Sequence, residues 1–165
     1  MKVCPKQLLL TLIVALSACQ PGLKSVAEPM TATVLFQGQQ CGRQQASPAL
    51  TRIVDQKALQ ALATRLDMPW PFAAGVDFQR QLLLLLEMGQ RPTTGYRLLL
   101  SDTAVAVNQA TAVLRLNWQQ PPADAMLAQM LTSPCLLLTL PRADYRVIEV
   151  VDDDGKRRLA LDLER

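Results

Sequence analysis

Hydrophobic and polar residues alternate over several segments in the second half of the chain, which is the pattern of strands with one face in water. From Ala112 to Trp118 every second residue is apolar, and the same period returns in Arg157–Leu163. The turn sequence Asp152-Asp153-Asp154-Gly155 joins that last segment to the apolar segment Tyr145–Val151. We predict strands at all three segments, with Trp118 in the core. Shorter strands are expected at Tyr96–Leu100 and Thr103–Asn108, and Asn108-Gln109-Ala110 is a candidate hairpin turn.

The clearest helical period follows Asp55. This residue fits an N-cap, whose carboxylate accepts hydrogen bonds from backbone N–H groups two and three residues further on. The apolar residues after it recur three or four positions apart, at Leu59, Leu62, Ala63 and Leu66. We predict one main amphipathic helix, from about Asp55 to Leu66. Met68-Pro69-Trp70-Pro71 should end it, because proline cannot continue the hydrogen-bond ladder.

Five consecutive leucines lie between Gln81 and Met88, where a buried helix turn and a buried strand compete. Leucine favours helix, but a run of about eight residues closed by Gly89 has the length of a strand, so we expect a central strand. Further strands are expected at Thr31–Phe36 and Leu50–Val54, and Met126–Thr132 and Cys135–Leu140 flank Ser133-Pro134. One helix among many short strands predicts an α+β fold with a mostly antiparallel β-sheet.

The N-terminus has the pattern of an export signal. Lys2 and Lys6 accompany an apolar run of about eleven residues, which is too short to cross a bilayer because that needs roughly 20. The run ends in Leu16-Ser17-Ala18-Cys19, which resembles a bacterial lipobox. That resemblance implies that residues 1–18 are a lipoprotein signal peptide. It also implies that Cys19 becomes lipidated and anchors the mature chain to a membrane.

The rest of the chain divides into two parts. Residues 19–30 contain Pro21 and Pro29 and have no apolar period, and we interpret them as a lipidated tether. Residues 31–165 suffice for a single globular domain with its own core. Aspartate after the lipidated cysteine commonly retains Gram-negative lipoproteins in the inner membrane. Gln20 at that position therefore favours the outer membrane, facing the periplasm.

Charge and composition exclude several classes of function. Without Lys2 and Lys6 the net charge falls from +3 to about +1, which leaves no basic footprint for nucleic acid. The chain has no histidine, no Cys-x-x-Cys pair and no glycine-rich phosphate loop. Catalytic triads and metal sites that depend on histidine are therefore excluded. We expect a protein that is not an enzyme, holds no cofactor or metal, and acts by binding.

Two cysteines follow the signal peptide and the lipidation site. Cys41 and Cys135 are an even number in an oxidising compartment. A disulfide between them would close a loop of roughly 90 residues, which the chain-entropy account values at about 4–5 kcal/mol. Two separate thiols, one of them buried as a small hydrophobe, explain the sequence equally well.

One loop has an unusual composition. The sequence GQRPTTGY, residues 89–96, lies between two expected strands; Pro92 fixes its own φ, and Gly95 permits a positive φ. Rigid loops suit binding because they lose little entropy on contact. The candidate partner-binding residues are Arg91, Pro92, Thr93, Thr94, Gly95 and Tyr96. A structural turn whose threonine hydroxyls cap their own backbone is the alternative.

Several motifs follow one another between residues 76 and 142. They are Val76-Asp77-Phe78, the apolar run Leu82–Leu86, GQRPTTGY, Gln119-Gln120-Pro121-Pro122 and Leu131-Thr132-Ser133-Pro134. In this order they resemble the C-terminal domain of the PrcB-type protease-complex subunit family. Thr94 and Cys135 depart from the family pattern, which usually has a glycine and an aromatic residue there. The resemblance implies a non-catalytic exported partner that stabilises or assists a protease; another envelope protein is the alternative partner.

A shorter resemblance points to a different function. RPTTGY is similar to the Asn-Pro-Thr-Thr-Gly loop of chagasin-type cysteine-protease inhibitors, which are immunoglobulin-like sandwiches. Pro92, Thr93, Thr94 and Gly95 match that loop, and Arg91 replaces its asparagine. This similarity implies an inhibitor that uses the Arg91–Tyr96 loop, and we keep it as the second hypothesis.

Overall fold

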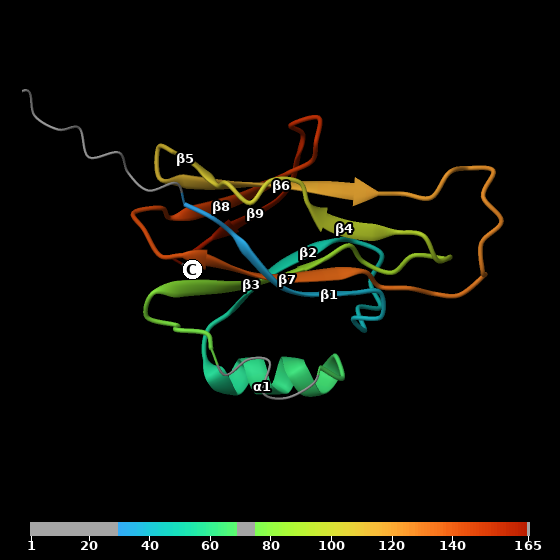
Figure 1. Ribbon diagram of the computed structural model, residues 1–165, viewed down its shortest axis with the longest axis horizontal. Coiled ribbons are helices and arrows are strands. Elements are labelled where there is room, and N and C mark those ends of the chain that lie inside the picture. Colours follow the sequence, from blue (N-terminus) through green and yellow to red (C-terminus); the bar gives the residue numbers. More distant parts are fainter. Residues whose placement is uncertain (1–29, 69–74, 165) are drawn as a thin grey trace, which may run out of the picture.

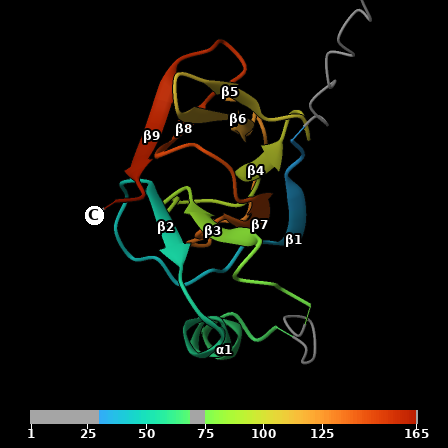
Figure 2. The same cartoon turned by 90° about the vertical axis from the view of Figure 1, so that its left-hand side faces the viewer.

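Two β-sheets pack face to face, and one helix covers the outer face of the first sheet (Figure 1); the three layers are visible along the sandwich in Figure 2. The computed structural model describes residues 30–68 and 75–164. The first sheet contains β1 (Thr33–Gly38), β2 (Ala49–Ile53), β3 (Gln81–Glu87) and β7 (Cys135–Pro141). The second contains β4 (Arg97–Leu100), β5 (Ala106–Asn108), β6 (Thr111–Gln119), β8 (Val147–Val151) and β9 (Arg157–Asp162). The helix is α1 (Gln56–Arg65).

Strand order in the first sheet is β1-β7-β3-β2, and in the second it is β4-β6-β8-β9, with β5 also paired to β6. These neighbours are antiparallel except β6 and β8, which are parallel. The parallel pair arises because the chain leaves β6 for β7 in the other sheet and returns as β8. For the residues that the structure describes, the predicted mostly antiparallel architecture with one helix is confirmed. Its division into two sheets is a feature that the alternation pattern did not indicate.

The leucine run of β3 is buried on both faces of the first sheet. One set of its side chains faces the second sheet. The core between the two sheets is formed by residues of β3, β7 and β6, namely Leu82, Leu84, Leu86, Leu136, Leu138, Leu140, Ala112, Leu114 and Leu116. The other set faces α1, and it includes Leu83, Leu85 and Leu137. A strand covered on both faces is apolar at every position, which is why this segment shows no alternation. The expected strand at Gln81–Met88 is confirmed as β3, between β7 and β2.

The helix begins where its cap predicts. The Asp55 carboxylate accepts a hydrogen bond from the backbone N–H of Ala58 at 2.7 Å. Leu59, Leu62 and Ala63 are buried against the first sheet. The last helical residue is Arg65, and Asp67 then takes a left-handed φ of 49°, so the helix stops before the prolines are reached. The helix predicted from about Asp55 to Leu66 is thus confirmed to within one residue at each end.

Two predicted turns form hairpins. Gln109 and Ala110, between β5 and β6, have φ values of 45° and 64°, the positive values of a two-residue hairpin turn. Gly155 closes the turn between β8 and β9, where its N–H donates to the Asp152 carbonyl at 2.9 Å. In contrast, residues 126–131 form no strand, and Thr132 takes part only in an isolated bridge with Arg91.

The membrane anchor predicted from the sequence lies outside the described residues. Residues 1–18, Cys19 and the tether up to Pro29 all fall there, so the signal peptide and the lipidation remain predictions. In the part of the chain that the structure describes, no helix combines the length and the apolar character that crossing a bilayer requires.

Candidate functional site

Two loops project together from one end of the sandwich (Figure 1), and we call residues 88–96 and 120–134 the loop end. The first loop connects β3 to β4, and the second connects β6 to β7. Arg91 and Thr132 exchange two backbone hydrogen bonds of 2.8 and 2.9 Å, and the Thr94 N–H donates to the Ala128 carbonyl at 3.3 Å. Each loop therefore stabilises the conformation of the other.

Gly95 fits the close contact between the two loops. Its φ is +93°, a region that residues with a side chain rarely adopt, and a Cβ atom there would lie 2.9 Å from Cβ of Pro121. A glycine is required at this position both by the backbone conformation and by the space. The predicted rigid loop tip therefore has a physical basis in the second loop as well as in its own proline and glycine.

The predicted partner-binding residues lie at the loop end, but the second loop covers much of their surface. Pro92 is exposed, whereas the rest of Arg91–Tyr96 is half-buried. The Thr93 hydroxyl donates to the Thr94 carbonyl at 3.1 Å, and the Thr132 hydroxyl donates to the Thr93 carbonyl at 2.9 Å. The polar atoms of the first loop thus serve largely to hold the loop end together.

The exposed apolar residues of the loop end belong to the second loop. Met126 is fully exposed, and Met130 and Leu131 expose 51% and 60% of their surface. The sequence did not indicate that these residues are exposed, because the segment Met126–Thr132 was grouped with the expected strands. The available signal was the absence of a period of two in a segment bounded by Pro121-Pro122 and Ser133-Pro134.

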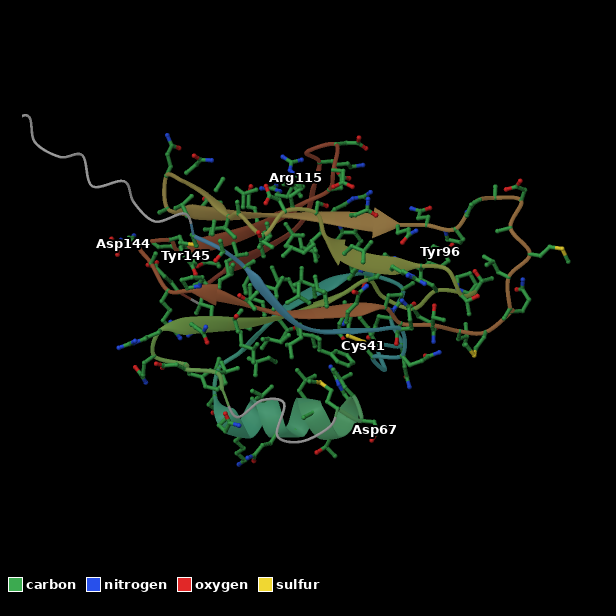
Figure 3. The ribbon with its side chains drawn as sticks, in the orientation of Figure 1. Cys41, Asp67, Tyr96, Arg115, Asp144 and Tyr145 are labelled. Atoms are coloured by element: carbon green, nitrogen blue, oxygen red, sulfur yellow. A yellow bond between two sulfur atoms is a disulfide. The ribbon has the colours of Figure 1, made fainter. Side chains whose placement is uncertain are left out.

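A disulfide between Cys41 and Cys135 fastens the base of the loop end; Cys41 is labelled in Figure 3. Both cysteines are buried, and their Cα atoms are 5.9 Å apart. Beside the disulfide, the Cys41 N–H donates to the Ser133 carbonyl at 3.0 Å and the Gly42 N–H donates to the Ser133 hydroxyl at 2.8 Å. The segment after β1 is thus tied to the residue at which the second loop meets β7.

A pocket of about 350 Å³ opens behind the first loop, between the ends of the two sheets. The guanidinium of Arg91 lies 5.8 Å from the centre of the Tyr96 ring, and that of Arg158 lies 5.7 Å from Trp118. Figure 3 shows Tyr96 at this end of the molecule. Trp118 is half-buried at the edge of the core, where it lines the pocket, and its Nε1 has no hydrogen-bond partner among the described residues.

The two arginines of the pocket differ in their partners. Arg158 forms an ion pair with Asp152, with Nε to Oδ2 at 2.9 Å. Burial acts to raise the pKa of Asp152, but hydrogen bonds from the Lys156 N–H and from Arg158 outweigh it, and the pKa is lower than its usual value. Arg91 has no carboxylate partner among the described residues and donates instead to the carbonyls of Ala46, Met88 and Gln90.

Across residues 30–68 and 75–164, no three Cys, Asp or Glu side chains gather as a metal site would require. Burial raises the pKa of Tyr145 to about 12, against a smaller opposing effect of Arg142. Its hydroxyl donates to the Pro141 carbonyl, and it lies at the opposite end of the molecule from Tyr96 (Figure 3). What the loop end offers is an exposed apolar loop beside a cationic and aromatic pocket.

The class of protein defined by this geometry is a β-sandwich domain with a rigid pair of loops at one end. The family model described as PrcB C-terminal matches residues 82–141, which run from the second residue of β3 to the last residue of β7. The match includes both loops of the loop end and confirms the resemblance predicted from the motifs. Comparisons with curated proteins and with solved structures find no match.

Proposed function

We propose that this chain is a non-catalytic accessory subunit of an exported protease complex, and that it binds its partner through the loop end. The observation that carries the proposal is the exposure of Met126, Met130 and Leu131 on a loop held in place by the Arg91–Thr132 hydrogen bonds. Exposed apolar patches on soluble domains commonly mark interaction sites, and methionine adapts to irregular partner surfaces. The match to the PrcB C-terminal family supports a protease complex as the setting.

The place where the described chain begins is consistent with this role. The described chain begins beside residues 103–105, where the Val105 N–H donates to the Met30 carbonyl and the Ala32 N–H donates to Thr103. β1 then runs along the first sheet until Gln40 reaches Ser133 of the loop end. The predicted anchor would therefore join the sandwich at the end opposite the loop end. A lipid on Cys19 would then leave the loop end free to reach a partner in the periplasm.

A non-catalytic role is supported by the residues at the loop end. The chain lacks histidine. Among the described lysines, Lys57 lies exposed on α1 and Lys156 lies exposed in the β8–β9 turn, and neither belongs to the two loops. The loop end therefore brings together apolar, aromatic and guanidinium groups that bind partners without forming covalent bonds.

The inhibitor hypothesis is less well supported by the geometry. An inhibitory wedge would present Thr93 and Thr94 to a protease cleft. In the structure both residues are half-buried, the Thr94 N–H bonds to Ala128, and the Thr93 hydroxyl bonds within its own loop. A stoichiometric titration of a papain-like protease with the purified chain tests this hypothesis directly, and we expect no loss of protease activity.

The test of the proposed function is in-cell crosslinking in the source bacterium, followed by mass spectrometry of the captured proteins. We expect an exported protease to be crosslinked by the wild-type chain and lost in Met126→Glu/Met130→Glu, because the two charges would have to be desolvated at the interface. Val107→Asp is the matched control, since Val107 is an exposed apolar residue (42%) on β5, outside the loop end. It should keep the partner.

A second readout separates binding from assistance. Deleting the gene should lower the amount or the activity of that protease, wild type and Val107→Asp should restore it, and Met126→Glu/Met130→Glu should not. If the double variant captures and supports the protease as well as wild type does, the loop end is not the interface. If crosslinking captures no protease at all, the accessory role is wrong.

A further inference from the structure

The pocket behind the loop end contains a positive charge that no carboxylate of the described residues balances. The guanidinium of Arg91 donates to three backbone carbonyls, those of Ala46, Met88 and Gln90, and forms no ion pair there. A guanidinium binds carboxylates strongly. An anionic group in the pocket would therefore balance the charge of Arg91.

The charge balance of the pocket favours an anion. Arg158 also lines the pocket, but Asp152 balances its charge at 2.9 Å. No aspartate or glutamate is among the residues that line the pocket. The pocket wall therefore presents one net positive charge, which comes from Arg91.

Apart from Gln120, the remaining wall is mainly aromatic and aliphatic, and the space is small. Tyr96, Trp118 and Met88 supply two rings and a thioether, and the volume is about 350 Å³. Ligand pockets run from about 300 to 1,000 Å³, so this one is at the small end of the range. It suits a single amino-acid residue and excludes a folded segment.

We propose that this pocket binds the C-terminal residue of a partner polypeptide, with its terminal carboxylate at Arg91 and an apolar side chain against Tyr96 and Trp118. A carboxylate and an apolar side chain occur on one residue only at a C-terminus, because Asp and Glu carry the carboxylate in place of the apolar group. This assignment rests on the proposed function, since Arg91 and Tyr96 belong both to the pocket and to the loop end.

The direct test is an NMR titration of the full chain that follows the Trp118 indole N–H resonance, assigned with Trp118→Phe. The probes are N-acetyl-leucine, N-acetyl-leucinamide, and N-acetyl-glutamic acid α-amide, which carries only a side-chain carboxylate. We expect N-acetyl-leucine to shift the resonance saturably, and the other two to bind at least tenfold more weakly. Equal binding of N-acetyl-leucine and its amide would overturn the proposal, as would tighter binding of the glutamate probe.

A matched pair of variants places the site. Gln120 lines the pocket and is exposed, so Gln120→Glu adds a negative charge at the pocket with little effect on folding. Gln119, also exposed, points to the other face of β6 because successive side chains of a strand alternate. We expect Gln120→Glu to weaken N-acetyl-leucine binding at least tenfold, and Gln119→Glu to leave it unchanged. An equal effect of both variants, or of neither, contradicts the assignment.

The two proposals fail differently. If the pocket prefers N-acetyl-leucine but crosslinking captures no exported protein, the accessory function is wrong and the pocket chemistry stands. If a protease is captured through the loop end but Gln120→Glu leaves its capture and the probe binding unchanged, the pocket assignment is wrong and the function stands.

Discussion

β3 and the second loop of the loop end are both rich in apolar residues, yet they meet opposite environments. In β3, Leu83, Leu84 and Leu86 have no exposed surface, because sheet or helix covers each face of the strand. In the second loop, Met126 is fully exposed and Leu131 exposes 60% of its surface. The same chemical property therefore serves folding in one segment and stays available to a partner in the other.

The difference follows from what surrounds the backbone. β3 pairs with β2 on one side and β7 on the other, so its backbone hydrogen bonds are made within the sheet. Its side chains pack against the second sheet on one face and against α1 on the other. The second loop is bounded by Pro121-Pro122 and Pro134, and it bonds to the first loop at only a few positions. The side chains of Met126, Met130 and Leu131 are not packed into a core, so the free energy of burying them remains to be released on binding.

The largest effect should come from the Cys41–Cys135 disulfide at the base of the loop end. We expect Cys41→Ala/Cys135→Ala to lower the free energy of unfolding by about 4 kcal/mol, because the bridge closes a loop with a sequence separation of 94 residues. Urea unfolding of wild type and double variant, each with and without reductant, measures it. Reductant should destabilise the wild type and leave the double variant unchanged. A double variant with the same midpoint as the oxidised wild type contradicts the expectation.

The core strand gives the next effect. Leu84→Ala should cost about 3 kcal/mol, within the 2–5 kcal/mol typical of a buried leucine, because it leaves a cavity between two sheets. The midpoint of urea unfolding measures the loss. Leu131→Ala, at a residue that is 60% exposed, is the matched control and should change stability by less than about 0.5 kcal/mol. Similar losses at the two leucines would remove the distinction between the regions.

A glycine pair sharpens the account of the loop end. Gly95→Ala should destabilise by about 2 kcal/mol, because alanine is strained at φ +93° and its Cβ would meet Pro121. Gly155→Ala has a φ of +79° but open space around the new Cβ, so it should cost only the backbone strain of about 1 kcal/mol. Thermal or urea unfolding compares them. If Gly155→Ala costs as much as Gly95→Ala, contact between the loops does not matter.

The sequence predicts the local elements of this fold better than their assembly. The Asp55 cap, the helix after it and the alternation in β6 are local signals, and each was confirmed. The separation into two sheets depends on which strands pair across long stretches of chain, such as β3 with β7. Alternation of apolar and polar residues indicates which face of a strand is buried, but it does not indicate which strand pairs with it. The arrangement of the strands in two sheets therefore could not be predicted from this pattern.

The candidate site shows the same limit. Pro92 and Gly95 identify the first loop from their own conformational properties. Arg158, Trp118 and Met126 join the loop end or its pocket only through folding, since they come from β9, β6 and the second loop. Trp118 was expected in the core because an indole among apolar residues is usually buried there. Its place at the edge depends on where the sheets end.

A smaller effect on stability, which appears only at acidic pH, tests the ion pair between Arg158 and Asp152 beside the pocket. The folded pKa of Asp152 lies below its usual 3.8, so the unfolded chain binds more protons in the window between the two values. The contribution of Asp152 to stability is therefore complete above about pH 4 and is lost as the pH falls through the folded pKa. Asp152→Asn should lose this part of the acid dependence. Urea unfolding measured between about pH 2 and 5 compares the two slopes, and identical slopes contradict the prediction.

The smallest effect on stability should be found where we expect the largest effect on binding. Met126→Ala/Met130→Ala should change the free energy of unfolding by less than about 0.5 kcal/mol, because both side chains are largely in water in the folded chain. Partner capture by crosslinking should nevertheless fall, since the lost apolar area is buried only in the complex. A double variant that unfolds markedly more easily than wild type would show that these methionines pack within the chain. The loop would then be part of the core, and the contrast with β3 would disappear.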